Sequence, residues 1–388
     1  MRYLLLSLAL VLSLNAIEHN SKLSLNFAQY SVYENEFYLQ GETELKQESE
    51  LVNTTLTLEY LYSSEYEERR YLLLNELYLT REHGDYSFLF GKSIKYWGEM
   101  EGYNIADIYN QKNYLLDPFD ISKKIGSIGF DIKRYFDEES LEFGVKLYEQ
   151  DLDYPTHTTP FSPFSFNYDS NLHLSDKQYT PSFYLAYNFV SESDIDSESK
   201  ILLFHGYDTK RYFIPINQTT LAQYAYRVNK LLFLSHLIYG ETIFKCEASY
   251  TDVINDTKMS DYRQLSFGLE RSFYDVAGVD ISGYLEYYNY SYTQDNKIKN
   301  VDISELYDND IFMAFRVDFT DIRASELKAG VFYDLANDER LFKLNAKSRI
   351  MDGLVVEAEF LKITTAKESV ITYLGDSSRA TLGLTYTF

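Results

Sequence analysis

The sequence predicts an all-β fold, a single transmembrane antiparallel β-barrel of about 18 strands. Three observations lead to this prediction. Segments of about ten residues alternate apolar and polar positions, short turns alternate with long connections, and no apolar run after residue 16 is long enough for a membrane helix. At 388 residues, of which 17% are aromatic and 24% charged, the chain is long for one soluble domain, but one barrel can use its whole length.

Residues 1–16 predict a cleaved signal peptide. Arg2 supplies the positive charge, an apolar run extends from Leu4 to Leu14, and Ala16 is a suitable last residue before the cut. The run is shorter than the ~20 residues that a helix needs to cross a bilayer, which disfavours an N-terminal anchor. We therefore expect residues 17–388 to form an exported barrel.

The composition argues against several classes of protein. The 59 Asp and Glu outnumber the 36 Lys and Arg, and the net charge of −23 repels the phosphates of nucleic acid. A single cysteine, Cys246, allows neither an intramolecular disulfide nor a cysteine-based metal cluster. No glycine-rich phosphate loop occurs. We expect no nucleic-acid partner, no cofactor and no metal.

The alternation has a period of two, which is typical of strands with one apolar and one polar face. In the last segment Leu382, Leu384 and Tyr386 share a face, opposite threonine and glycine. The polar faces carry more full charges than a packed interior tolerates, so a soluble β-sandwich explains the pattern less well. We expect the apolar faces to meet lipid and the polar faces to line a water-filled lumen, which only a closed barrel permits.

The sequence predicts 18 strands. The first, eighth and tenth of them show the weakest alternation, so a barrel of 16 strands is the alternative. The centres of the 18 strands are Leu25, Glu42, Thr57, Glu76, Phe90, Asp131, Val145, Leu185, Phe204, Lys230, Glu247, Phe267, Leu285, Phe315, Val331, Leu344, Ala358 and Leu384. Short connections at 82–85, 137–140, 240–242 and 351–353 alternate with long ones near 96–125, 151–178, 209–223, 291–308 and 363–377. This parity predicts short periplasmic turns, long extracellular loops and periplasmic termini.

A resemblance to a known family is confined to residues 75–120. The matching positions are Glu76, Tyr78, Gly84, Asp85, Gly91, Lys92, Trp97, Gly98, Glu99, Asp107, Asp117, Pro118, Phe119 and Asp120, with Asp117 where the family has asparagine. They resemble a porin-like outer-membrane family of Gram-negative bacteria, long catalogued as a domain of unknown function. The C-terminal Phe388 is similar to the aromatic signal that such barrels present to the barrel-assembly machinery. The resemblance implies a channel or uptake porin in the bacterial outer membrane.

The segment 96–126 is the candidate constriction loop, because it is long and mixes aromatic with charged residues. Its candidate pore residues are Glu99, Glu101, Asp107, Asp117 and Asp120. The alternative is an external loop that lies over the mouth. The acidic stretch 295–310 predicts a mild preference for cations.

Strand positions on the polar faces supply the other candidates. The acids are Glu42, Glu44, Glu76, Glu142, Glu247, Glu270, Glu286, Glu357 and Glu359, and the bases are Lys92, Lys146, Lys245, Arg316, Lys328, Lys343, Lys347 and Arg349. The bases are weighted towards the later strands, which predicts a transverse field across the lumen that favours polar solutes. The alternative for any one residue is a charge that merely pairs across strands.

Catalytic motifs are weak. His173 and Ser175 are a close His–Ser pair without a third partner, and Asp151, Asp153, His157 and His173 have no regular metal-ligand spacing. We expect passive diffusion of small hydrophilic solutes and no catalytic residue. A surface barrel hydrolase of the lipase or protease type, or a barrel component of an export or assembly machine, is the alternative. Outer-membrane lipid and lipopolysaccharide are expected to surround the barrel, and a homotrimer is left open.

Overall fold

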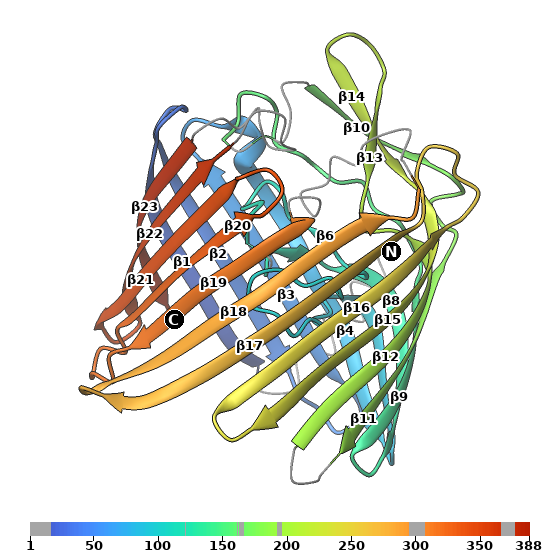
Figure 1. Cartoon of the computed structure of the whole chain (residues 1–388), viewed down its shortest axis with the longest axis horizontal. Coiled ribbons are helices and arrows are strands. Elements are labelled where there is room, and N and C mark those ends of the chain that lie inside the picture. Colours follow the sequence, from blue (N-terminus) through green and yellow to red (C-terminus); the bar gives the residue numbers. More distant parts are fainter. Residues whose placement is uncertain are drawn as a thin grey trace.

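The chain forms a closed β-barrel in the computed structural model, which describes residues 17–120, 122–160, 162, 167–191, 196–294, 307–365 and 377–388 (Figure 1). The proposed signal peptide lies outside the described residues. The barrel strands are β1 (Ile17–Tyr30), β2 (Glu36–Gln47), β3 (Asn53–Ser63), β4 (Arg70–His83), β5 (Tyr86–Ser93), β8 (Ser127–Phe136), β9 (Glu139–Lys146), β11 (Ser182–Ser191), β12 (Asp196–Tyr207), β15 (Arg227–Tyr239), β16 (Thr242–Val253), β17 (Tyr262–Val276), β18 (Val279–Tyr292), β19 (Asn309–Asp318), β20 (Glu326–Asp334), β21 (Arg340–Met351), β22 (Leu354–Thr364) and β23 (Ser377–Thr387).

These strands make one 18-stranded sheet. Each pairs antiparallel with its neighbours in the order given, and β1 pairs with β23, from Lys22 opposite Thr387 to Tyr30 opposite Arg379. The sheet thus has no free edge, as a barrel in hydrocarbon requires. All 18 predicted centres fall within these strands, so the predicted count is confirmed and the alternative of 16 is wrong. No helix among the described residues has the length and apolar character needed to span a bilayer.

Several short elements lie outside the barrel sheet. The strands β10 (Asn167–Leu174), β13 (Tyr212–Pro215) and β14 (Thr220–Ala225) form a three-stranded sheet that projects beyond one rim of the barrel (Figure 1). They arise from two of the long connections, whose own strand structure the sequence analysis did not predict. A 3₁₀ turn, η1 (Glu67–Arg69), and the two-residue strands β6 (Gln111–Lys112) and β7 (Lys124–Ile125) complete the fold.

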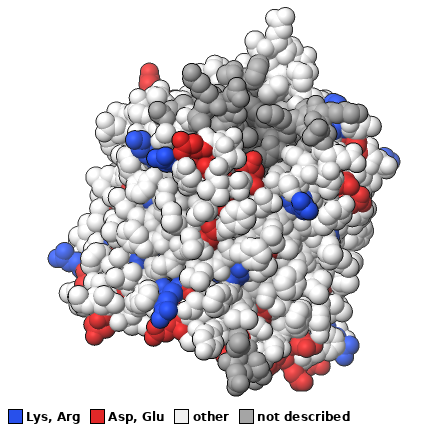
Figure 2. Space-filling view, viewed as in Figure 1, with Lys and Arg blue, Asp and Glu red and all other residues white. Residues whose placement is uncertain are grey.

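The outward faces of the strands are apolar, as predicted. Leu203, Leu231 and Leu285 are each 50% exposed, and Leu382 is 58% exposed. The side chain of Cys246 shares this outer face with Phe244, which is exposed. Figure 2 shows that the middle of one outer face is largely uncharged and that charged side chains gather towards its two rims. An apolar belt of this kind is what lipid tails require of a membrane barrel.

This orientation leads to a prediction about two sites, on β19 and on β21, which are separated by one strand. Phe315 is 45% exposed on the outer face of β19, whereas Asn345 of β21 lines a cavity inside the barrel. Phe315→Arg is expected to lower the free energy of unfolding by about 2–4 kcal/mol, because a guanidinium near the bilayer midplane loses its hydration. Asn345→Arg is the matched control and should cost much less. Denaturant unfolding in lipid vesicles measures both, and equal costs would contradict the orientation.

Candidate pore and its inserted loop

The segment between β5 and β8 folds into the barrel, where wall carboxylates bind its backbone. Glu247 of β16 is fully buried, and its two carboxylate oxygens accept hydrogen bonds from the backbone N–H of Glu99 (2.6 Å) and of Ile105 (2.9 Å). Glu247 points inward from its strand. A loop that lay over the outside of the mouth could not bring two backbone N–H groups to it.

A second wall carboxylate binds the next part of the same loop. Glu286 of β18 is 2% exposed and accepts hydrogen bonds from the backbone N–H groups of Glu101 (2.8 Å) and Gly102 (2.9 Å). The hydroxyl of Tyr288 also donates to Glu286 and in turn accepts from the backbone N–H of Tyr103 (3.0 Å). Because every carboxylate oxygen of Glu247 and Glu286 accepts a backbone N–H of the loop, these two acids fix its course.

Ion pairs fasten the remainder of the loop. Asp107 pairs with Lys124 at 2.6 Å, and burial raises the pKa of Asp107 although the ammonium of Lys124 opposes this effect. Glu101 pairs with Lys328 of β20 at 2.8 Å. Burial alone would raise the pKa of Glu101, but the charge and hydrogen bond of Lys328 outweigh burial and lower it. Glu99 lies 3.1 Å from the ring of His236.

A buried charge cluster joins the loop to the last strand. Asp117 lies 2.8 Å from the guanidinium of Arg379 at the start of β23, and Arg379 also pairs with Glu359 of β22. Lys343 of β21 lies 3.6 Å from Glu359. Burial opposes the ionised form of Asp117, yet Arg379 and Lys343 together hold its pKa below the usual range. Asp117 therefore stays ionised in this site.

The loop fills one side of the lumen with apolar contacts. Trp97, Ala106 and Ile108 pack against inward leucines of β12 and β15, among them Leu202 and Leu232, which are fully buried. The expectation of a polar lumen is therefore wrong for this part of the wall. The physical reason is that the inserted loop, rather than water, covers these inward positions.

The opposite side of the lumen keeps open space. A cavity of about 420 Å³ lies between the loop and β19–β21, where Phe312 and Phe332 face Lys328 and Lys343. A cavity of about 270 Å³ lies between the loop and β21–β23, β1 and β2, and its lining carries the acids Asp117, Asp120, Glu326, Glu357 and Glu359 and the bases Lys123, Lys347 and Arg379. Asp120 and Asn345 line both cavities, so the two are adjacent. This side of the lumen is therefore lined by charged and polar side chains from both the loop and the wall.

Most of the candidate pore residues meet at this loop and its walls. Glu101, Asp120 and Lys343 line the larger cavity, and Asp117, Asp120 and Lys347 line the smaller one. Glu99, Asp107 and Glu247 are engaged in fastening the loop. Arg316 shares the inward series of β19 with Ala314 and donates to Asp318 at 3.1 Å. Arg349 donates to the carbonyl of Ile322 in the turn between β19 and β20 and lines neither cavity.

Lys92 does not line the lumen, which corrects the sequence analysis. It pairs with Ile128 in the β5–β8 register, and Ile128 is 45% exposed on the outer face. Its neighbour Ser93 is buried on the inner face. Directly opposed residues share a face, so the stem of Lys92 runs along the outside while its ammonium reaches the Leu74 carbonyl at 2.7 Å.

Arg379 is central to the site but was not among the predicted pore residues. The alternation of the last predicted strand was recognised only over residues 380–388, whereas β23 begins at Ser377. The signal that could have found it is the inward parity of position 379, which follows from the outward Leu382 and Leu384. Glu286 was on the list of polar-face acids, but no pattern in the sequence indicated that it would bind the loop.

The residues considered for catalysis lie on the projecting sheet. His173 belongs to β10 and is exposed, and the exposed Ser175 is held through its backbone N–H to the carbonyl of Ala225 (3.0 Å). His157 contacts Asn167 at 3.1 Å, and Asp151 accepts a hydrogen bond from Gln178. Within the described part of the chain, the residues weighed as a metal site on 151–173 do not form a group of three ligands.

The fold is a closed, 18-stranded antiparallel β-barrel, and solved outer-membrane proteins share it. The chain is similar to OccK11 (OpdR) of Pseudomonas aeruginosa, with a TM-score of 0.56 at 10% identity over 96% of each chain. OccD3 (OpdP) gives 0.55 at 8% identity over 96% of this chain and 91% of that one. OpdK solved with vanillate gives 0.55 at 7% identity over 96% and 98%. No protein-family model matches the sequence, and no curated protein matches it.

Proposed function

We propose that the chain is a passive channel in the outer membrane of a Gram-negative bacterium, and that the loop 96–126 is its constriction. The observation that carries the proposal is the binding of four loop N–H groups by Glu247 and Glu286 inside a closed barrel. Beside the anchored loop, the two cavities lined by described residues lie along β19–β23, β1 and β2, where the lining carries charged side chains. Small hydrophilic solutes would pass down their gradient through this space without a cofactor.

The size and lining of the open side indicate the kind of solute. Cavities of about 270 and 420 Å³ suit molecules of the size of an amino acid, a sugar or a small organic acid. OpdK, a protein of the same fold, was solved with vanillate. Swelling of liposomes that contain the purified chain would test permeation with such solutes. Swelling no faster than that of empty liposomes would contradict the proposal.

We also propose that residues 75–120 place the chain in the porin-like family that they resemble. The exposed C-terminal ring of Phe388 would serve as the signal to the barrel-assembly machinery. Lipid and lipopolysaccharide would surround the apolar belt, and a homotrimer would bury part of it. His173 and Ser175 contribute nothing to permeation in this proposal, and their substitution should leave swelling rates unchanged.

Ion selectivity provides a further prediction. The smaller cavity is lined by five acidic and three basic side chains, and the larger by two of each kind. We expect a mild preference for cations, because acids outnumber bases along the open side. The acidic stretch 295–310, most of which lies outside the described residues, would add to the same preference. Reversal potentials in a potassium chloride gradient measure it, and an anion-selective channel would contradict it.

A further inference from the structure

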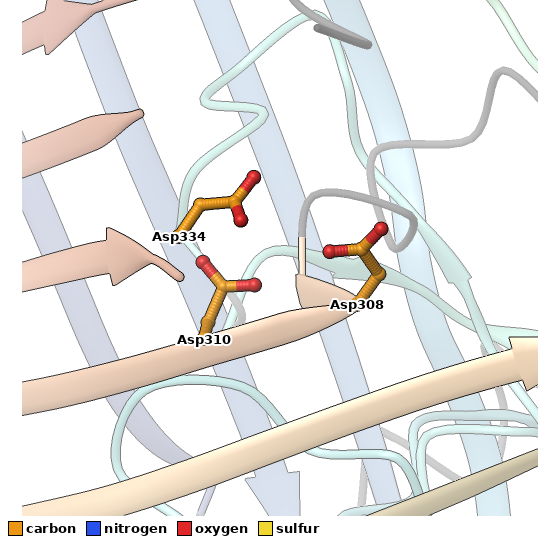
Figure 3. A group of neighbouring side chains, drawn as sticks. All are labelled: Asp308, Asp310 and Asp334. Carbon is orange, nitrogen blue, oxygen red and sulfur yellow. The ribbon is translucent and has the colours of Figure 1, made fainter. Parts of the chain in front are cut away.

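Three carboxylates converge where β19 begins and β20 ends, and none of them lines either of the two cavities (Figure 3). Asp308 directly precedes β19, Asp310 lies at the start of β19, and Asp334 ends β20. Each offers an oxygen within 4.8 Å of the others. Asp310 is 2% exposed and Asp334 is 4% exposed. This rim is the one that carries the long loops, so the group lies on the extracellular side of the barrel in the proposed orientation.

The hydrogen bonds around the group leave oxygen lone pairs unused. Asp334 accepts from the backbone N–H groups of Ala336 (2.6 Å) and Asn337 (2.9 Å) and from the Asn337 amide (2.8 Å). Asp310 accepts from the backbone N–H of Asn309 at 3.2 Å. One carboxylate oxygen of Asp308, Oδ1, is buried and has no hydrogen-bond partner among the described residues. A buried carboxylate oxygen without a donor is costly unless something positive occupies the space beside it.

A fourth carboxylate gives an independent indication. Glu339 is 6% exposed, and its Oε1 is buried without a hydrogen-bond partner among the described residues. Its backbone carbonyl accepts the N–H of Asp334 at 3.0 Å, which holds the two residues together. Glu339 is thus a buried acid with an oxygen left unpartnered by the described residues, held directly beside Asp334.

The described residues provide no cation that offsets these charges. Arg340 follows Glu339 directly but pairs with the exposed Asp338 at 3.1 Å. Across the described ranges, no lysine or arginine forms an ion pair with Asp308, Asp310, Asp334 or Glu339. A set of buried acids without a basic partner is stable only when it is protonated or binds a metal ion.

We propose that Asp308, Asp310 and Asp334, with Glu339 beside them, bind a calcium ion at the extracellular rim. The donors are all carboxylate oxygens, which hard cations prefer, and the site contains no sulfur or imidazole that would favour zinc or copper. Calcium takes six to eight oxygens in a flexible geometry, so backbone carbonyls and water can complete a site of irregular shape. Magnesium, which is smaller, requires a stricter octahedron.

The site lies next to a residue that contacts the inserted loop, so a bound ion would affect the structure of the loop. Asp308 directly follows Tyr307, which is buried and stacks on Tyr103 of the inserted loop with ring centroids 4.4 Å apart. The ion would join the ends of β19 and β20 and hold Tyr307 against the loop. Calcium is therefore expected to stabilise the barrel rim and to steady the loop, without entering the path of the solute.

The test uses the full mature chain, refolded in detergent without lipopolysaccharide, because lipopolysaccharide itself binds calcium. Tb³⁺ is the probe, since nearby tyrosines sensitise its luminescence and calcium competes for its sites. The variants are Asp310→Asn, Asp334→Asn and the milder Asp308→Asn, whose residue is only partly buried. The matched control is Asp352→Asn, an exposed acid in a turn at the opposite rim.

The expected result is saturable Tb³⁺ luminescence that calcium displaces, together with a calcium-dependent rise in the thermal midpoint. Each site variant should weaken binding by on the order of tenfold or more, because affinity follows the number of charged ligands, and Asp352→Asn should bind as the unchanged chain does. If Asp310→Asn or Asp334→Asn fails to fold, Asp308→Asn decides the question. Absent binding, or binding that all three site variants retain, would overturn the proposal.

Discussion

Removal of residues 101–118 is expected to raise single-channel conductance several-fold. Met100 and Phe119 line the same cavity and belong to one apolar cluster, so a short glycine–serine linker can rejoin the chain there. The deletion removes Glu101 and Gly102, which bind Glu286, and the aromatic residues that narrow the lumen. Conductance through a water-filled pore grows with its narrowest cross-section, and this deletion widens that section.

The control is a loop deletion outside the lumen. Residues 216–219 form the tip of the β13–β14 hairpin, which projects beyond the rim (Figure 1). Their deletion should leave conductance unchanged, because the tip lies away from the cavities. An unchanged conductance after removal of 101–118 would show that the loop does not set the narrowest section.

Arg379→Met is expected to have the largest effect of any single substitution on the stability of the inserted loop. Arg379 is 6% exposed and pairs with both Asp117 and Glu359, so its loss leaves two acids without their guanidinium. Removal of one partner from a buried ion pair costs about 3–5 kcal/mol. We expect a lower free energy of unfolding in vesicles and frequent transitions between conductance levels, because the C-terminal half of the loop loses its attachment to β23.

A double-mutant cycle separates the ion pair from other effects of the substitution. The variant with both Arg379→Met and Asp117→Leu should be more stable than the sum of the single changes predicts, by about 1–3 kcal/mol. Lys343 remains beside Glu359 in that variant and offsets part of the lost charge. Strict additivity of the two changes would mean that the pair contributes nothing to the attachment of the loop.

The strands could be predicted because the residues within each strand suffice to show its alternation of apolar and polar side chains. Lipid on one side and water or protein on the other impose a period of two on every strand, as the outward Leu382 and Leu384 show. The parity of Lys92 was nevertheless assigned wrongly. Phe90 is exposed on the outer face, and simple alternation places Lys92, two residues further on, on that same face. The charge of Lys92 suggested the lumen, but its long stem lets the ammonium reach a backbone carbonyl from the outer side.

The course of the inserted loop could not be predicted in the same way. It depends on contacts between residues far apart in sequence, such as the backbone of Glu99 with the side chain of Glu247. A backbone N–H is present at nearly every position, so no residue type in the loop marks the ones that are bound. The buried Leu202 and Leu232 carried a clue, because inward leucines in a barrel need a covering segment.

Single-channel recording of the purified full chain in a planar bilayer tests the central claim most directly. The account predicts discrete, long-lived conductance steps, mildly selective for cations, from an aqueous path along β19–β23, β1 and β2. Insertion of the folded barrel without any conductance step would contradict it, because the loop would then close the lumen and the charged cavities would not be connected across the membrane.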